Sequence, residues 1–254
     1  MYRHNRRKIT SPEEGYIAPF AIADGLYFVG THQASSHMID TGDGLILIDT
    51  GYANTASMVL DSVRALGFDP KDIKYIIHTH HHGDHVAATP EILRFAKNAK
   101  TVISKLDAPI AEANYGIIHD VTVEDGDVLA LGDKRIRFLL TPGHTVGTIS
   151  LFFEATYNGK SYRVGTFGGA GANTLVPEAR DFYPECRKDY AKSLDRLLCE
   201  KVDIFIGNHV WNNDTEEKGK RLLAGGENEF IDAEEWKKFL LSRRSVLLSL
   251  PPIA

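Results

Sequence analysis

The first third of the chain alternates short apolar runs with turn residues, a pattern typical of β-strands. These runs occupy residues 26–30, 35–41 and 44–51. The segment 41–44, "TGDG", has the composition of a hairpin turn, so the chain is expected to open with antiparallel strands. Between Ala56 and Leu66, apolar residues recur at offsets of three, four, seven and ten positions and stop at Gly67. This spacing predicts an amphipathic helix with a glycine cap.

Strands and helices continue to alternate toward the C-terminus. Strands are predicted within 73–79, 100–105, 127–144, 148–169 and 202–209, helices within 91–98, 184–200 and 236–250, and a helix or loop within 106–116. The segments 127–144 and 148–169 should each hold two strands joined by a turn. No repeat or linker divides the chain, so this order predicts one unit of two packed sheets with helices outside.

Composition is that of a compact globular protein and argues against a nucleic-acid binder. With 254 residues, 43% of them hydrophobic, the chain can bury a large core. Its net charge of −5 gives no extended positive field, and the one basic cluster lies at the N-terminus: Arg3, Arg6, Arg7 and Lys8. A small-molecule substrate is therefore expected, with no nucleic-acid partner, and the sequence indicates no particular oligomeric state.

Residues 1–20 are predicted to form a polar N-terminal segment ahead of a single domain spanning 21–254. The basic start resembles a secretory signal, but the polar run 11–20, "SPEEGYIAPF", stands where the apolar core of a signal is required. No uncharged apolar run approaches the ~20 residues that cross a bilayer, so no membrane partner is expected. The sequence as given predicts a cytoplasmic protein, or a periplasmic or secreted one if a leader was removed.

Histidines gather in the segment His78–His85, "HTHHHGDH", at the end of a predicted strand. A window of eight residues would hold about 0.35 histidines by chance, given 11 in 254 residues, whereas this one holds five. On a strand, His80 and His82 would point the same way with Cα atoms about 6.5 Å apart, so both could bind one cation. The segment is therefore predicted to be a metal site.

The residues that follow complete a ligand set. Gly83 permits a sharp turn, after which Asp84 and His85 would face the same place as His80 and His82. Three imidazoles and a carboxylate are ligand types that suit zinc.

The other histidines considered divide into predicted ligands and histidines with a structural role. His81 would alternate to the opposite face and His78 lies back inside the strand, so both are expected to be packed or hydrogen-bonded. Two further histidines stand where an apolar strand meets a turn, His144 in "LLTPGHTVGT" and His209 in "IFIGNHV". Three strands that end side by side would bring six ligands to one edge of the sheets.

These motifs resemble the metallo-β-lactamase superfamily. The segment "HTHHHGDH" contains the H-x-H-x-D-H motif of that family, "LILIDTG" resembles its upstream strand, and "TPGHTVGT" and "GNH" resemble the segments that supply its later histidines. The order and spacing agree from about residue 24 to 250. The resemblance implies an αββα sandwich, in which two mixed β-sheets carry helices on their outer faces and a metal site lies in the cleft between the sheet edges.

One departure distinguishes this chain from many relatives. Glyoxalase II and the acyl-homoserine lactonases place a bridging aspartate after a strand, whereas the matching stretch here, 163–174, has no carboxylate. His80, His82 and His144 would then hold one metal, and Asp84, His85 and His209 the other. This division resembles the third subclass (B3) of metallo-β-lactamases. That subclass typically carries serines where this chain has Gly169 and Gly171, a difference that weakens the expectation of β-lactam binding.

The resemblance implies a dinuclear hydrolase with two Zn²⁺ ions per chain, in which a metal-bridging hydroxide attacks a carbonyl. Asp84 is the predicted catalytic residue, both a ligand and the group that orients the hydroxide and carries its proton. Asp49 is read either as a support for the ligands or as a turn-forming aspartate. A cyclic amide is the first choice of substrate and a lactone or other ester the second. An iron-dependent sulfur dioxygenase and a binding protein with a vestigial site are more remote alternatives.

Overall fold

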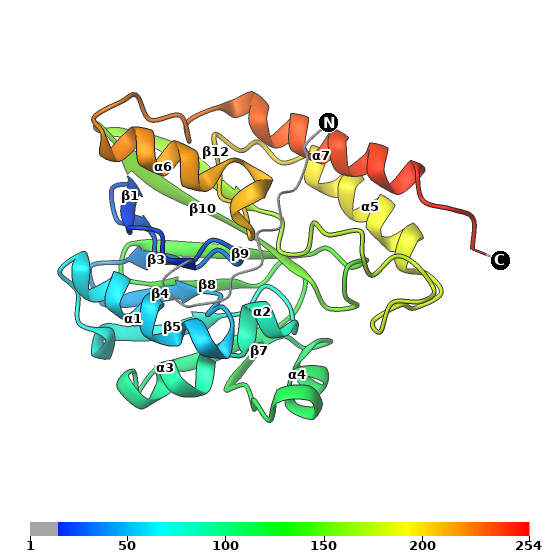
Figure 1. The fold of residues 1–254 in the computed structure, drawn as a ribbon, viewed down its shortest axis with the longest axis horizontal. Coiled ribbons are helices and arrows are strands. Elements are labelled where there is room, and N and C mark those ends of the chain that lie inside the picture. Colours follow the sequence, from blue (N-terminus) through cyan, green and yellow to red (C-terminus); the bar gives the residue numbers. More distant parts are fainter. Residues whose placement is uncertain (1–14, 254) are drawn as a thin grey trace.

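Two mixed β-sheets face each other at the centre of the protein, and helices cover both outer faces (Figure 1). The computed structural model describes residues 15–253. The first sheet has the order β1-β2-β3-β4-β5-β6-β7, with bounds Phe20–Ala23, Leu26–Phe28, His37–Asp40, Leu45–Ile48, Ile73–Ile77, Lys100–Ser104 and Val121–Val123. The second has the order β12-β11-β10-β9-β8, with bounds Ile204–Phe205, Lys160–Thr166, Ile149–Tyr157, Lys134–Leu140 and Val128–Leu131. The predicted αββα sandwich is confirmed.

Strand direction changes within each sheet. Strands β1 to β4 pair antiparallel, including the hairpin predicted at 41–44, whereas β4 to β7 pair parallel. In the second sheet only β11 and β12 are parallel. The parallel strands β5 and β12 each lead into one of the histidine segments, so both segments leave their sheets on the side where parallel strands end.

The helices pack in two groups. Their bounds are α1 Ala56–Ala65, α2 Gly83–Val86, α3 Thr89–Phe95, α4 Ala108–Tyr115, α5 Cys186–Leu198, α6 Thr215–Leu223 and α7 Ala233–Leu248. One apolar cluster fills the space between the sheets, a second joins α1 and α3 to the first sheet, and a third joins α5 and α7 to the second sheet. Three hydrophobic layers thus hold the four structural layers together.

The structure differs from the sequence prediction at several points. Strands β1 and β7 and helix α6 were not anticipated, because their apolar runs are short. The described part of the predicted polar segment 1–20 joins the fold, since Ile17 and Phe20 are buried in the central cluster. The basic cluster at Arg3 to Lys8 lies outside the described residues. Within residues 15–253, every helix is too short or too polar to cross a membrane.

Candidate metal centre

The histidine segment is a loop rather than the end of a strand. Strand β5 ends at Ile77, and helix α2 begins at Gly83, so His80 and His82 lie in irregular backbone between them. Strand alternation is therefore the wrong reason for their convergence, although their ring centroids do lie 4.7 Å apart. Gly83 does not have the positive φ of a left-handed turn, and a Cβ there would make a tight contact, 3.0 Å from the Tyr115 hydroxyl oxygen.

Six side chains meet as two trios at one end of the sandwich. His80, His82 and His144 form the first trio, and Asp84, His85 and His209 the second; the candidate ligand atoms of each lie within 4.8 Å of one another. The other four residues follow β5 of the first sheet, whereas His144 and His209 follow β9 and β12 of the second, so both sheets contribute. The structure brings the six residues together in the division that the sequence predicts, while their binding of metal stays a prediction.

Asp49 fixes the ring orientation of one histidine in each trio. Its Oδ2 accepts hydrogen bonds from His85 Nδ1 at 2.7 Å and from the Thr79 hydroxyl at 2.8 Å, and its Oδ1 accepts from Thr79 N at 2.8 Å. Because the Thr79 hydroxyl donates to Asp49, its oxygen must accept from His80 Nδ1, 3.1 Å away. His80 and His85 are thus both protonated on Nδ1, which leaves Nε2 to face the centre.

Asp49 also has the alternative role that the sequence suggested, that of a turn-forming aspartate. Its backbone has a φ of +56°, in the left-handed region, directly after β4. This turn places the buried carboxylate under the histidine loop. Asp49 therefore makes both the turn and the support.

The remaining histidines are also held by one ring nitrogen. His144 Nδ1 donates to the Gly171 carbonyl at 2.8 Å, and His209 Nδ1 donates to the Gln33 carbonyl at 2.7 Å. His82 is oriented the other way round, since its Nε2 donates to Asp181 Oδ2 at 3.0 Å. Its Nδ1 therefore faces the centre.

The first trio has the charge and geometry of a cation site. Burial and the neighbouring histidines hold the pKa values of His80 and His144 well below the usual range, so both rings are neutral. His80 Nε2 and His82 Nδ1, the two unprotonated nitrogens, face each other at 3.1 Å. Two lone pairs repel at this distance unless a cation lies between them. Nitrogens that bind one tetrahedral zinc at 2.0–2.1 Å are about 3.3 Å apart, close to this separation.

The second trio carries more charge. Burial raises the pKa of Asp84, but His85, His209 and His82 outweigh it and the net pKa lies below the usual value. Burial opposes protonation of His85, yet Asp84 and Asp49 raise its pKa to about 9. His85 Nε2 is buried, lies 3.6 Å from Asp84 Oδ2 and has no hydrogen-bond partner among residues 15–253. A metal ion would replace the proton on this nitrogen, so the donor set fits a divalent cation.

The histidines excluded from the ligand set lie outside both trios. His78 is buried and hydrogen-bonds His119 at 2.7 Å and Thr89 at 2.8 Å. His81 lies beside His82, with ring centroids 4.9 Å apart, and its Nε2 contacts Asp181 Oδ1 at 3.3 Å. His81, His82 and Asp181 also lie close enough to hold a cation, but Asp181 here accepts hydrogen bonds from both rings. Both roles are those predicted for packed or hydrogen-bonded histidines.

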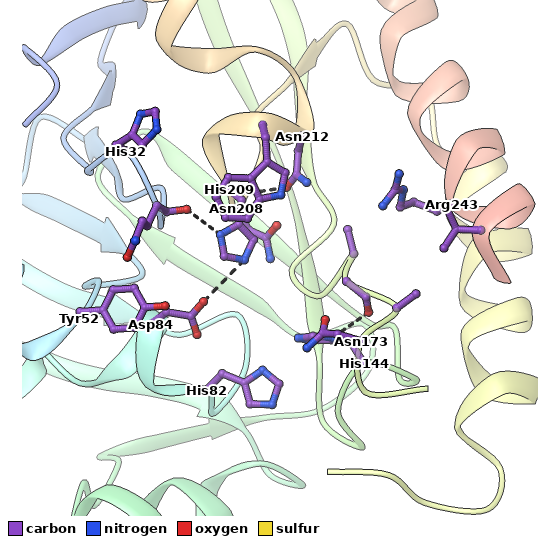
Figure 2. A pocket seen from close by; sticks show the side chains of 16 residues that line it. His32, Tyr52, His82, Asp84, His144, Asn173, Asn208, His209, Asn212 and Arg243 are labelled. Carbon is purple, nitrogen blue, oxygen red and sulfur yellow. Dashed lines mark hydrogen bonds and ion pairs between the residues drawn. The ribbon is translucent and has the colours of Figure 1, made fainter. Parts of the chain in front are cut away.

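A pocket of about 540 Å³ opens above the two trios. Figure 2 shows His82, Asp84, His144 and His209 on one side of it, and Arg243 reaching in from α7 on the opposite side. Gly171 also lines the pocket. A Cβ on Gly171 would lie 3.1 Å from His144 Cε1, and one on Gly169 would lie 2.8 Å from His144 Cβ. A Cβ on Gly171 would also lie 2.5 Å from Asn173 Oδ1, so the loop packs closely on a candidate ligand and a side chain at either glycine would have to displace its neighbours.

Asp181 and Arg243 are two site residues that sequence reasoning missed. Asp181 lies in an irregular segment 99 positions from His82, and no motif marks it. Arg243 belongs to a helix that was predicted from its apolar positions alone. Only the packing of the segment after β11 against the histidine loop, and the position of α7 beside the pocket, could reveal them.

A family profile and several known proteins match this chain. The sequence profile of the Metallo-beta-lactamase superfamily matches residues 29–209. The Beta-lactamase-like protein 2 homolog of Caenorhabditis elegans is 28% identical over 194 residues, 69% of this chain and 61% of that protein. The hydroxyacylglutathione hydrolase of Mesorhizobium japonicum is 40% identical over 98 residues, 39% of this chain and 35% of that protein. These matches span less than two thirds of either relative.

Solved structures match over more of their length. The native FEZ-1 metallo-β-lactamase from Legionella gormanii is 28% identical, with a TM-score of 0.86 over 93% of this chain and 96% of that one. BJP-1, a subclass B3 metallo-β-lactamase of Bradyrhizobium japonicum, is 28% identical, with a TM-score of 0.84 over 92% and 93%. The class B3 di-zinc enzyme LRA-12 from an Alaskan soil metagenome is 28% identical, with a TM-score of 0.83 over 95% and 96%. The chain belongs to the metallo-β-lactamase superfamily of metal-dependent hydrolases, and its fold is similar to that of subclass B3.

Proposed function

We propose that the protein is a zinc hydrolase that holds two metal ions and opens a cyclic amide. The observation that carries the proposal is the orientation of the histidine rings. His80, His82 and His85 each give one nitrogen to a protein acceptor and turn the other toward the centre. This arrangement is expected of metal ligands held by surrounding hydrogen bonds. The di-zinc neighbour from the soil metagenome supports zinc as the metal.

His80, His82 and His144 would hold one ion, and Asp84, His85 and His209 the other. When bound, such ions polarise a carbonyl and lower the pKa of water to about 7, so that a nucleophile is present at neutral pH. Asp84 is proposed as the catalytic residue because its carboxylate belongs to a trio and also lines the pocket. It can orient the attacking water through one oxygen, accept its proton and pass that proton to the leaving nitrogen.

A cyclic amide is favoured because no carboxylate is common to both trios. The segment 163–174, which supplies a bridging aspartate in glyoxalase II and the lactonases, places the Gly171 carbonyl and the Thr174 hydroxyl next to His144 and has no carboxylate. The similarity in fold to subclass B3 enzymes supports the same choice. A lactone or other ester is the second candidate, and the local similarity to hydroxyacylglutathione hydrolases favours it.

Metal analysis and a substrate panel test the proposal. Protein purified without added metal should contain two zinc ions per chain, and it should hydrolyse a chromogenic cephalosporin or, for the second candidate, members of a lactone and thioester panel. His82→Ala should lose metal and activity together. One iron per chain with oxygen consumption would instead indicate a dioxygenase, and equal turnover by His82→Ala would show that the ligand assignment is wrong.

A further inference from the structure

Arg243 is a cationic side chain of the pocket that has no carboxylate partner within residues 15–253. It lies on α7, where its guanidinium sits 5.4 Å from the Phe239 ring and its Nε is 3.3 Å from Ser242 Oγ. The next residue, Arg244, is ion-paired with Asp195 on α5. One turn of the helix therefore holds one arginine that ties two helices together and one that faces the pocket without a described carboxylate paired to it.

Few other charged side chains line the pocket beside Arg243. Arg243 is the one lysine or arginine among the described lining residues, and Asp84 is the one acidic residue. Asp84 belongs to a trio, so its charge would be taken up by a metal ion. If the two trios held metal ions, the pocket would carry positive charge on two opposite sides and would favour a negatively charged molecule.

The loop between them lines the pocket with the neutral side chain of Asn173 and brings no charged side chain to it. A Cβ on Gly169 would lie 2.8 Å from His144 Cβ, so a serine there would need the loop to move. A cationic side chain that binds an anion must therefore come from elsewhere on the pocket wall, and α7 supplies Arg243.

We propose that Arg243 binds a carboxylate group of the substrate while the carbonyl to be attacked lies at the two trios. The inference deepens the proposed function and rests on it, since it names the substrate class as a carboxylate-bearing cyclic amide or ester. A guanidinium binds a carboxylate through paired N–H donors, which fixes the orientation of the bound molecule. The pocket volume of about 540 Å³ lies within the range of small-molecule sites, so one ligand can span it.

Matched substrates test the inference. The best substrate of the panel should be compared with its methyl ester, in which the carboxylate is masked, using wild type, Arg243→Ala, Arg243→Lys and the control Arg244→Ala. Arg243→Ala should raise KM for the carboxylate substrate about 10- to 100-fold, the effect of one charge-assisted hydrogen-bond pair, with little change in kcat. Arg243→Lys should recover part of the loss. KM for the methyl ester, and both values in Arg244→Ala, should stay near wild type.

Two outcomes would overturn the inference: unchanged KM in Arg243→Ala, or equal losses on the carboxylate substrate and its ester. If wild type turns over neither substrate, the proposed function fails separately. Calorimetric titration of the zinc-loaded proteins with a carboxylate-bearing lactam and its methyl ester then decides about Arg243. Tighter binding of the carboxylate that disappears in Arg243→Ala supports the subsite, and equal binding by both proteins refutes it.

Discussion

Replacing Asp49 with asparagine should weaken metal binding at both trios without changing the shape of the site. The retained Oδ1 can still accept from Thr79 N, but an NH₂ group replaces Oδ2 and faces the Thr79 hydroxyl and His85 Nδ1. The NH₂ group is a donor, so His85 Nδ1 and the Thr79 hydroxyl can no longer donate to it. His85 Nδ1 must instead accept, and the ring carries its proton on Nε2. The Thr79 hydroxyl turns to donate toward His80 Nδ1, with the same effect on His80.

The magnitude follows from these bonds. Loss of a group that orients a metal ligand typically weakens metal binding 10- to 100-fold, about 1.4–2.7 kcal/mol. Asp49→Asn should cause a loss of this size at each of the two metal sites. The metal-free protein should also lose stability, by about 1–3 kcal/mol for each of the two hydrogen bonds broken, because Asp49 is buried.

Competition with a chromogenic zinc chelator measures both sites. Thr79→Val is the matched control, because it removes the link to His80 and leaves the bond between Asp49 and His85. It should weaken one site, whereas Asp49→Asn weakens two. Circular dichroism identifies any variant that does not fold. Wild-type affinity at both sites in folded Asp49→Asn would refute the reasoning from ring tautomers.

Three further predictions concern other contacts of the site. Asp181→Ala should weaken zinc binding about 10-fold by releasing His82 Nε2, measured by the same competition, while Glu178→Gln, an exposed control on the same segment, should have no effect. Gly169→Ser should lower zinc affinity and thermal stability together, because its Cβ would lie 2.8 Å from His144 Cβ; a more stable variant with unchanged affinity would contradict this. Without metal, the raised pKa of His85, near 9, adds roughly 3 kcal/mol to the free energy of unfolding; this stabilisation is present below pH 6.5 and is lost as pH rises through 9. The lowered pKa values of His80 and His144 have the opposite effect, because they destabilise the fold as pH falls below 6.5. Urea unfolding of the metal-free protein should therefore show greatest stability near pH 6.5, and a rise in stability from pH 7 to 9 would contradict the assignment.

Local sequence was sufficient for most elements of the fold and for the choice of candidate ligands. Hydrophobic periodicity predicts the strands and helices because each element buries one face against the next layer. The spacing within "HTHHHGDH" brings His80, His82, Asp84 and His85 within reach of one another, whether the backbone is a strand or, as found, a loop leading into α2. Segments of three or four residues, such as β1 and β7, gave too short a pattern to be recognised.

Tertiary structure alone decided how the ligands are held and what surrounds them. The tautomers of the histidines depend on acceptors such as Gly171 for His144 and Gln33 for His209, 27 and 176 positions away. Asp181 and Arg243 join the site because a segment after β11 and the C-terminal helix pack near the histidine loop. Such contacts leave no periodic trace in the sequence, because each is a single side chain placed by the packing of whole layers. The sequence by itself determined which atoms could bind a metal, and only the fold decided which of those nitrogens carry protons and which charge faces the substrate.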